Sequence, residues 1–208
     1  MGPWTQAAFD IQRLDFTLDF LFDYLSRFHL KRNMRLGLAH PVPGSQDGFI
    51  PAQDMRRVVE RLYSHRHLFD AHRVRLRLGC GFPLCRFSDA ELGWLHRSRG
   101  HAPFGCGPAL SISPDMTVYH CLPLADYQRK SLFEFDTMEQ IDRHFARLRD
   151  AIKAEIAGSF EECDGCRSQE DGGCGGGGLC QIVGGVIDEA PIRHAGGEDG
   201  ISNHRLPR

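Results

Sequence analysis

Apolar residues in the first third of the chain switch twice between helical and extended spacing. A recurrence at every third or fourth position predicts a helix over residues 14–28, capped by Asp15, with the apolar face Leu14, Leu18, Leu21, Leu25 and Phe28. A second helical pattern covers residues 52–66, and short strands are predicted at residues 34–39 and 74–78. This order of helices and strands predicts a right-handed α/β unit with parallel strands.

Two parallel strands do not form an independent sheet. Parallel sheets are also normally covered on both faces. We therefore expect further strands from elsewhere in the protein, or a segment of a larger barrel. After the strand at 34–39, Pro41, Pro43 and Gly44 predict a loop that runs to about Gly48.

The second half of the chain combines a hairpin with one long helix. Extended runs at 110–113 and 117–121 flank Pro114-Asp115, which supplies turn chemistry, so they predict a β-hairpin. Thr137-x-x-Gln140 begins the longest predicted helix, which ends at Gly158 and buries a face made of Met138, Ile141, Phe145, Leu148, Ile152 and Ile156. We expect the opposite, basic face of this helix to be solvated.

The composition limits the classes of partner and compartment. The chain has 208 residues, of which 41% are apolar, and its formal net charge of −2 gives no reason to expect a nucleic acid as partner. The sequence shows neither a secretory pattern nor an apolar run of about 20 residues, so we expect a cytoplasmic protein without a membrane partner. A thiol-reducing compartment disfavours disulfides and favours metal binding by the eight cysteines.

Half of these cysteines lie in a glycine-rich stretch that has almost no large apolar side chains to bury in a hydrophobic core. The four thiols are Cys163, Cys166, Cys174 and Cys180, and Leu179 is the only large apolar side chain between the first and the last of them. Metal–thiolate bonds are therefore the expected ordering force. The stretch by itself leaves open a structural zinc site, an iron–sulfur cluster, disulfides, and a disordered segment with incidental cysteines.

The other four cysteines follow predicted elements. Cys80 and Cys85 come directly after the second strand, where α/β folds place their sites, although small buried side chains are an equally ordinary interpretation. A capping box at Ser88 and Glu91 then begins a short helix. The remaining pair, Cys106 and Cys121, stands at the two open ends of the hairpin, and we expect a shared metal site there.

The hairpin and the cysteine spacing together resemble the SPASM domain, the auxiliary iron–sulfur module at the C-terminus of many radical S-adenosylmethionine enzymes. The hairpin motif of that family, I-x-P-D-G-x-V-x-x-C, reads here Ile112-Ser113-Pro114-Asp115-Met116-Thr117-Val118-Tyr119-His120-Cys121. The second motif reads Cys163-x2-Cys166-x7-Cys174-x5-Cys180. The resemblance covers about residues 10–182, and it implies that the first α/β unit is the last part of a partial (β/α)6 barrel.

The resemblance implies two sets of cluster ligands. Cys106, Cys121 and Cys180 would hold one auxiliary [4Fe–4S] cluster, with Cys80 or Cys85 as the fourth ligand. Cys163, Cys166 and Cys174 would hold a second cluster, whose fourth ligand is either absent or the remaining member of the Cys80/Cys85 pair.

The chain departs from the family pattern at several points. Met116 stands where the family has glycine, the spacings of seven and five replace five and three, and no cysteine follows Cys180. The sequence also contains no C-x3-C-x2-C triad, which holds the S-adenosylmethionine-cleaving cluster in the family. We therefore expect a chain that needs a separate half-barrel partner, and S-adenosylmethionine, for radical chemistry.

These observations give an α/β fold in three parts. Residues 1–79 are a barrel remnant, residues 80–182 a small α+β SPASM-like iron–sulfur domain with a β-hairpin, and residues 183–208 a disordered tail. The expected function is electron transfer or anchoring of a peptide substrate by auxiliary clusters, with no catalytic residue of its own assigned. The alternative from another class is a zinc-stabilised binding module without catalysis.

Overall fold

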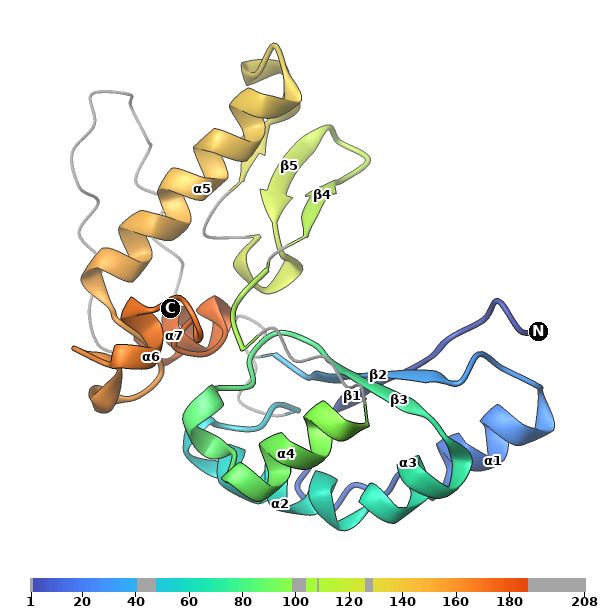
Figure 1. Cartoon of the computed structure of the whole chain (residues 1–208). Helices are drawn as coiled ribbons and strands as arrows, with labels where there is room; N and C mark the ends of the chain where they lie inside the picture. The colour runs from blue at the N-terminus through green and yellow to red at the C-terminus, as the bar shows by residue number, and fades with distance from the viewer. Residues whose placement is uncertain (1, 41–47, 99–103, 108, 126–128, 187–208) are drawn as a thin grey trace.

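The structure is a computed structural model, and it describes residues 2–40, 48–98, 104–107, 109–125 and 129–186. Figure 1 shows a lobe formed by a parallel sheet with four helices, and above it a long helix that lies beside a hairpin. The cysteine-rich segment lies at the foot of the long helix, next to the first lobe. The predicted loop at 41–47 and residues 187–208 of the predicted tail lie outside the described residues.

The first sheet has three parallel strands in the order β1 (Ala7–Ile11), β2 (Asn33–Leu38) and β3 (Arg75–Leu78). β2 and β3 confirm the two predicted parallel strands, and β1 supplies the further strand that they needed. Within the described residues these strands do not close into a barrel. The larger barrel therefore stays a prediction.

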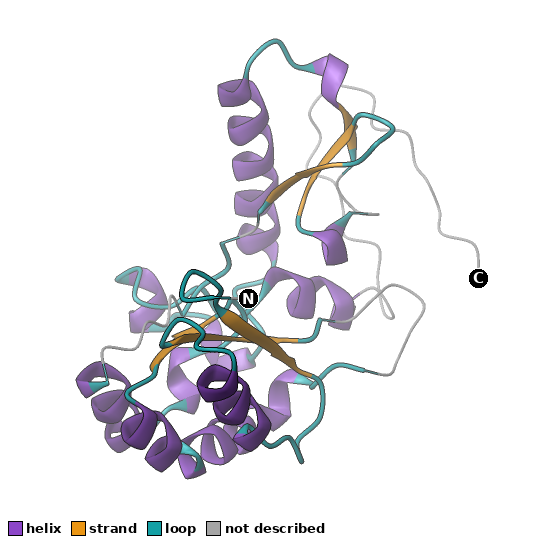
Figure 2. Ribbon diagram, turned by 90° about the vertical axis from the view of Figure 1, so that its right-hand side faces the viewer, coloured by secondary structure: helices purple, strands orange, loops and turns teal. Residues whose placement is uncertain are grey.

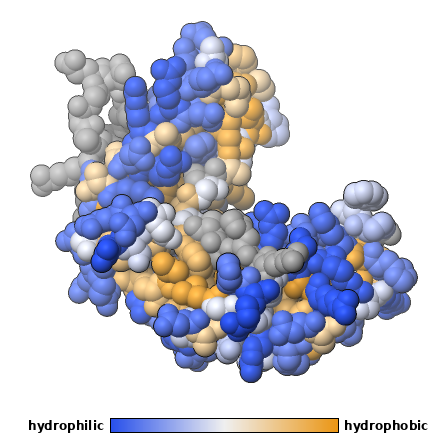
Figure 3. Space-filling model, viewed as in Figure 1, coloured by the Kyte–Doolittle hydropathy of each residue, from blue (hydrophilic) through white to orange (hydrophobic). Residues whose placement is uncertain are grey.

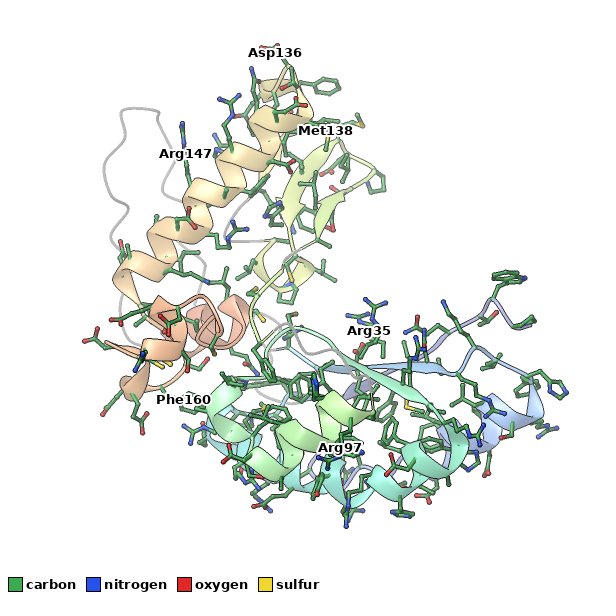
Figure 4. The ribbon with its side chains drawn as sticks, viewed as in Figure 1. Arg35, Arg97, Asp136, Met138, Arg147 and Phe160 are labelled. Atoms are coloured by element: carbon green, nitrogen blue, oxygen red, sulfur yellow. The ribbon has the colours of Figure 1, made fainter. Side chains whose placement is uncertain are left out.

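Helices α1 (Asp19–Arg27), α2 (Met55–Ser64), α3 (Arg66–His72) and α4 (Asp89–Arg97) all lie on one side of this sheet (Figures 1 and 2). They cover the apolar face of the strands, and the core between them includes Phe22, Met34, Leu36, Met55, Leu62, Phe69, Leu76 and Trp94. On the other face of the sheet Arg35, Arg75 and Arg77 are exposed, and Figure 4 shows Arg35 pointing away from the helices.

Two helix predictions need correction. The predicted helix at 14–28 begins only at Asp19, and Asp15 pairs with Arg13 at 2.9 Å instead of capping the helix. The predicted helix at 52–66 begins as a 3-10 turn, Ala52–Asp54, and is divided at His65 into α2 and α3. The capping box of α4 is confirmed, since Ser88 accepts a hydrogen bond from the Glu91 backbone N–H and Glu91 accepts one from the Ser88 N–H.

The second sheet confirms the predicted hairpin. Strands β4 (Leu110–Ile112) and β5 (Thr117–His120) are antiparallel, and β6 (Lys130–Ser131) pairs with the outer edge of β5. Helix α5 (Met138–Glu155) packs Ile141 and Phe145 against Val118 of the hairpin. Thr137 caps this helix as predicted, by accepting a hydrogen bond from the Gln140 N–H. The face of α5 that Figure 3 shows is largely hydrophilic, and Figure 4 shows Arg147 pointing outward from it.

The cysteine-rich segment is built of short turns and ends in a helix. It contains a 3-10 turn at Glu161–Cys163, α6 (Arg167–Glu170) and α7 (Leu179–Val186), so the first residues of the predicted tail, 183–186, belong to a helix. Leu179, Cys180 and Ile182 are buried against Leu124 and Ile152. This segment therefore contributes to a small apolar core, which the sequence reading did not expect.

Candidate metal centres

The carboxyl ends of two parallel strands begin the first candidate centre. β2 leads into His40 and β3 leads into Cys80, and the parallel register sets Leu36 beside Leu78 just before both strands end. Cys80 Sγ lies 3.9 Å from His40 Nε2. Cys80 therefore lies at the carboxyl end of the parallel strands, where we expected a site.

The hairpin brings a second pair of thiols to the same place. Cys121 directly follows β5, and its backbone N–H donates to the Ala109 carbonyl at 3.0 Å, which draws the ends of the hairpin together. Cys106 then lies close enough to Cys121 for its charge to raise the pKa of that thiol. The N-terminus of α7 supplies Cys180, which is 5% exposed.

Cys80, Cys106, Cys121 and Cys180 form one group, here called site A. Burial, followed by the charges of Cys80 and Cys106, raises the pKa of Cys121 from 9.0 to about 11. Burial and then the other three thiols raise the pKa of Cys180 well above its usual range. The pKa of Cys106 is also raised, chiefly by burial and in smaller part by Cys80. The thiolates of Cys106, Cys121 and Cys180 therefore need positive charge nearby to form at neutral pH.

Hydrogen-bond donors also face site A. The backbone at Leu179 lowers the pKa of Cys106 and that at Gln181 lowers the pKa of Cys180, so each partly offsets the effect of burial. His40 Nδ1 lies 3.0 Å from Cys180 Sγ. Burial lowers the pKa of His40, Asp10 raises it and Arg35 lowers it, with a net decrease. The sequence does not predict His40 as a member of this group, because its partner Cys180 lies far away in the chain.

Cys85, Cys163, Cys166 and Cys174 form a second group, here called site B. All four line one cavity of about 270 Å³. Burial raises the pKa of Cys85, Arg86 lowers it, and Cys174 and Cys163 raise it further. Cys85 is the most exposed of the four and belongs to the short 3-10 turn Leu84–Arg86.

The wall of site B joins the cysteine-rich segment to the first lobe. The Arg86 guanidinium lies 3.8 Å from the centre of the Phe160 ring, and both residues line the cavity. Figure 4 shows Phe160 where the two parts meet. The wall also includes Gln169, whose Oε1 is buried without a hydrogen-bond partner among the described residues.

Glycines of the cysteine-rich segment fit closely against glycines from elsewhere, between the two sites. A Cβ on Gly175 would lie 2.8 Å from Gly105 Cα, and a Cβ on Gly176 would lie 2.9 Å from Gly158 Cα. A Cβ on Gly178 would lie 3.4 Å from Gly81 Cα. These glycines therefore allow one backbone segment to approach another closely.

The structure thus distributes all eight cysteine candidates between two groups of four. Cys80 lies with Cys106, Cys121 and Cys180, whereas Cys85 lies with the remaining three. Cys85 lines the same cavity as Cys163, Cys166 and Cys174, and its role as the fourth cluster ligand stays a prediction. Within the described residues, no three His, Cys, Asp or Glu side chains are placed to hold a single metal ion.

Comparison of the chain with protein-family models, with curated proteins and with solved structures found no match. Among the described residues, no helix combines the length and apolar character that crossing a membrane requires.

Proposed function

We propose that this protein binds two iron–sulfur clusters, one in each group of four cysteines, as the auxiliary-cluster part of a radical S-adenosylmethionine enzyme. The observation that carries the proposal is the division of the eight thiols into two groups of four. Four cysteine thiolates are the usual ligand set of a [4Fe–4S] cluster. The resemblance to the SPASM domain gives the same chemistry for these residues.

The shape of site B favours a cluster over a single ion. Zinc is held by thiolates at about 2.3 Å from the metal, so its four ligands converge on one point. The thiols of site B instead line a cavity of about 270 Å³, which one zinc ion would leave largely empty. We therefore place the zinc-stabilised module second.

The residues of the chain would provide the cluster ligands and hydrogen-bond donors to them, and would exclude water from the site. A bound [4Fe–4S] cluster supplies one-electron redox chemistry. In site A, the backbone at Leu179 and at Gln181 lowers the pKa of Cys106 and Cys180 respectively, which favours the thiolate form and partly offsets burial. Burial of Cys180 beside Leu124 and Ile152 keeps water from this side of the site.

The wider function also belongs to this proposal. The clusters would pass electrons to or from a substrate radical, or anchor a peptide substrate, in a cytoplasmic enzyme that modifies peptides or proteins. A separate half-barrel would supply the triad that cleaves S-adenosylmethionine, because the sequence has no C-x3-C-x2-C.

The test is anaerobic reconstitution of the full chain with iron and sulfide, followed by metal analysis. We expect about eight irons per chain and an absorption band at about 400 nm. Cys80→Ser and Cys85→Ser are a matched pair only five positions apart. We expect the first to impair the cluster of site A alone and the second that of site B alone, each with a loss of up to half of the iron.

Three results would contradict the proposal. Stoichiometric zinc in a colourless protein would favour the zinc-stabilised module. Protein that takes up neither iron nor zinc would exclude both functions. If Cys80→Ser and Cys85→Ser change the same spectroscopic signal, the division into two sites is wrong.

A further inference from the structure

His40 stands between two thiols of site A that come from distant parts of the chain. Its Nδ1 lies 3.0 Å from Cys180 Sγ, and its Nε2 lies 3.9 Å from Cys80 Sγ. Gly81 lies beside the ring, since a Cβ built on that glycine would lie 3.8 Å from His40 Cε1. Both ring nitrogens therefore face sulfur.

The two contacts are unequal, and this assigns the proton. A neutral imidazole has one N–H, whereas a cluster-bound thiolate can only accept a hydrogen bond. The short contact, at Nδ1, is within the range of an N–H···S hydrogen bond, and the contact at Nε2 is at its outer limit. The geometry is therefore best satisfied by a proton on Nδ1 that is donated to Cys180.

We infer that His40 is a positioning residue of site A, which donates its Nδ1–H to the Cys180 thiolate and raises the reduction potential of the cluster held there. The inference rests on the proposed function. Reduction adds negative charge to a cluster and its sulfurs, and a hydrogen-bond donor stabilises that charge more in the reduced than in the oxidised state. His40 is the only side-chain donor to a site A sulfur that we find among the described residues.

The test compares two substitutions of similar size at this position. His40→Leu removes the donor, whereas His40→Asn keeps an N–H donor the same number of bonds from Cα as Nδ1. Both are made in the full chain carrying Cys163→Ser and Cys174→Ser, so that site A gives the only signal. The midpoint potential is measured by potentiometric titration monitored by electron paramagnetic resonance, together with iron and sulfide content.

We expect His40→Leu to lower the potential, so that the ratio of reduced to oxidised cluster falls about tenfold at the parent midpoint, or about 59 mV for one electron. His40→Asn should recover most of this shift. His96→Leu, at an exposed position of α4, is the control and should leave the potential unchanged.

A His40→Leu variant with full iron content and an unchanged potential overturns the inference, and so does an Asn variant that behaves like Leu. These results leave the proposed function intact, whereas a parent protein without iron and sulfide defeats both.

A second measurement keeps His40 in place, so it tests the inference even if the His40→Leu variant binds no iron. In the parent protein with ¹⁵N-labelled histidine, we expect the weak hyperfine coupling of a hydrogen-bonded nitrogen. A strong coupling would make His40 a ligand of iron and would overturn the inference.

Discussion

Met116 lies in the hairpin turn and is one of the few non-glycine residues with a left-handed backbone. Its φ of 63° lies in the left-handed region, which is the conformation that a glycine at this turn would adopt without strain. Asp115 holds the turn by accepting a hydrogen bond from the Thr117 N–H at 3.1 Å. The hairpin was therefore predictable from Pro114-Asp115 although the glycine is missing, because the turn does not depend on that residue alone.

The Cys121 thiol gives a prediction for the metal-free protein. Its folded pKa of about 11 lies above the usual 9.0, so its contribution to stability is complete below about pH 9 and is lost as the pH rises through 11. We expect the melting temperature of the metal-free chain to fall over this interval, and to fall less steeply in Cys121→Ser. Thermal unfolding followed by circular dichroism under reducing conditions measures both slopes.

Equal slopes in the parent and in Cys121→Ser would contradict a raised pKa for this thiol.

Among the elements, the short turn that carries Cys85 is tied to two helices through one arginine. Arg56 of α2 donates to both carboxylate oxygens of Glu91 in α4, at 2.6 and 2.9 Å, and to the Arg86 carbonyl at 2.8 Å. The Glu91 side chain is only 4% exposed. Burial raises the pKa of Glu91, but its bonds to Arg56 and Ser88 lower it more, so the carboxylate is charged and depends on this arginine.

We expect Arg56→Leu to destabilise the protein by about 2–3 kcal/mol, because it leaves a buried carboxylate without its partner. It should also lower iron binding in site B more than in site A, since Arg86 adjoins Cys85. Chemical denaturation and iron analysis measure the two effects. Arg57→Leu breaks only the exposed pair with Asp54 and should cost less than about 1 kcal/mol; equal costs for the two variants would refute this role of Arg56.

The helices and strands also show which parts of the fold the sequence predicts and which it does not. Strands β2 and β3, the hairpin and α5 were predicted because each has a clear period or turn signal. β1 was missed since five residues, AAFDI, give too short an alternation to stand out beside a helical pattern. The division of α2 from α3 at His65 was missed because no proline or glycine marks it.

At the scale of the whole molecule, the assignment of thiols to sites depends on contacts that local patterns do not contain. Cys80 and Cys85 are close in sequence but belong to different sites, because Gly81 turns the chain with a φ of 97° directly after Cys80. The sequence named both as candidates and left their partners open. The cysteine-rich segment packs closely against Gly81 and Gly105, and such contacts between distant parts of the chain are not visible in local sequence patterns.

The glycine contacts between the sites give a prediction with a matched control. Gly176 and Gly172 share a φ of 73°, but a Cβ on Gly176 would lie 2.6 Å from the Ala157 carbonyl oxygen, whereas nothing lies within 4 Å of one on Gly172. We expect Gly172→Ala to cost about 1 kcal/mol for backbone strain alone, and Gly176→Ala at least about 2 kcal/mol with a loss of iron from site B. Denaturation and iron content of both variants measure this.

Similar losses in the two glycine variants would mean that backbone conformation matters at Gly176 and the close approach does not.

The span of each ligand set has a consequence for biosynthesis. Site A requires Cys80 and Cys180 together, and site B requires Cys85 and Cys174, so neither set is complete until almost the whole cysteine-rich segment has left the ribosome. If the two groups bind clusters as proposed, cluster delivery would follow translation of this region, because a nascent chain halted within α5 would contain only half of the thiols.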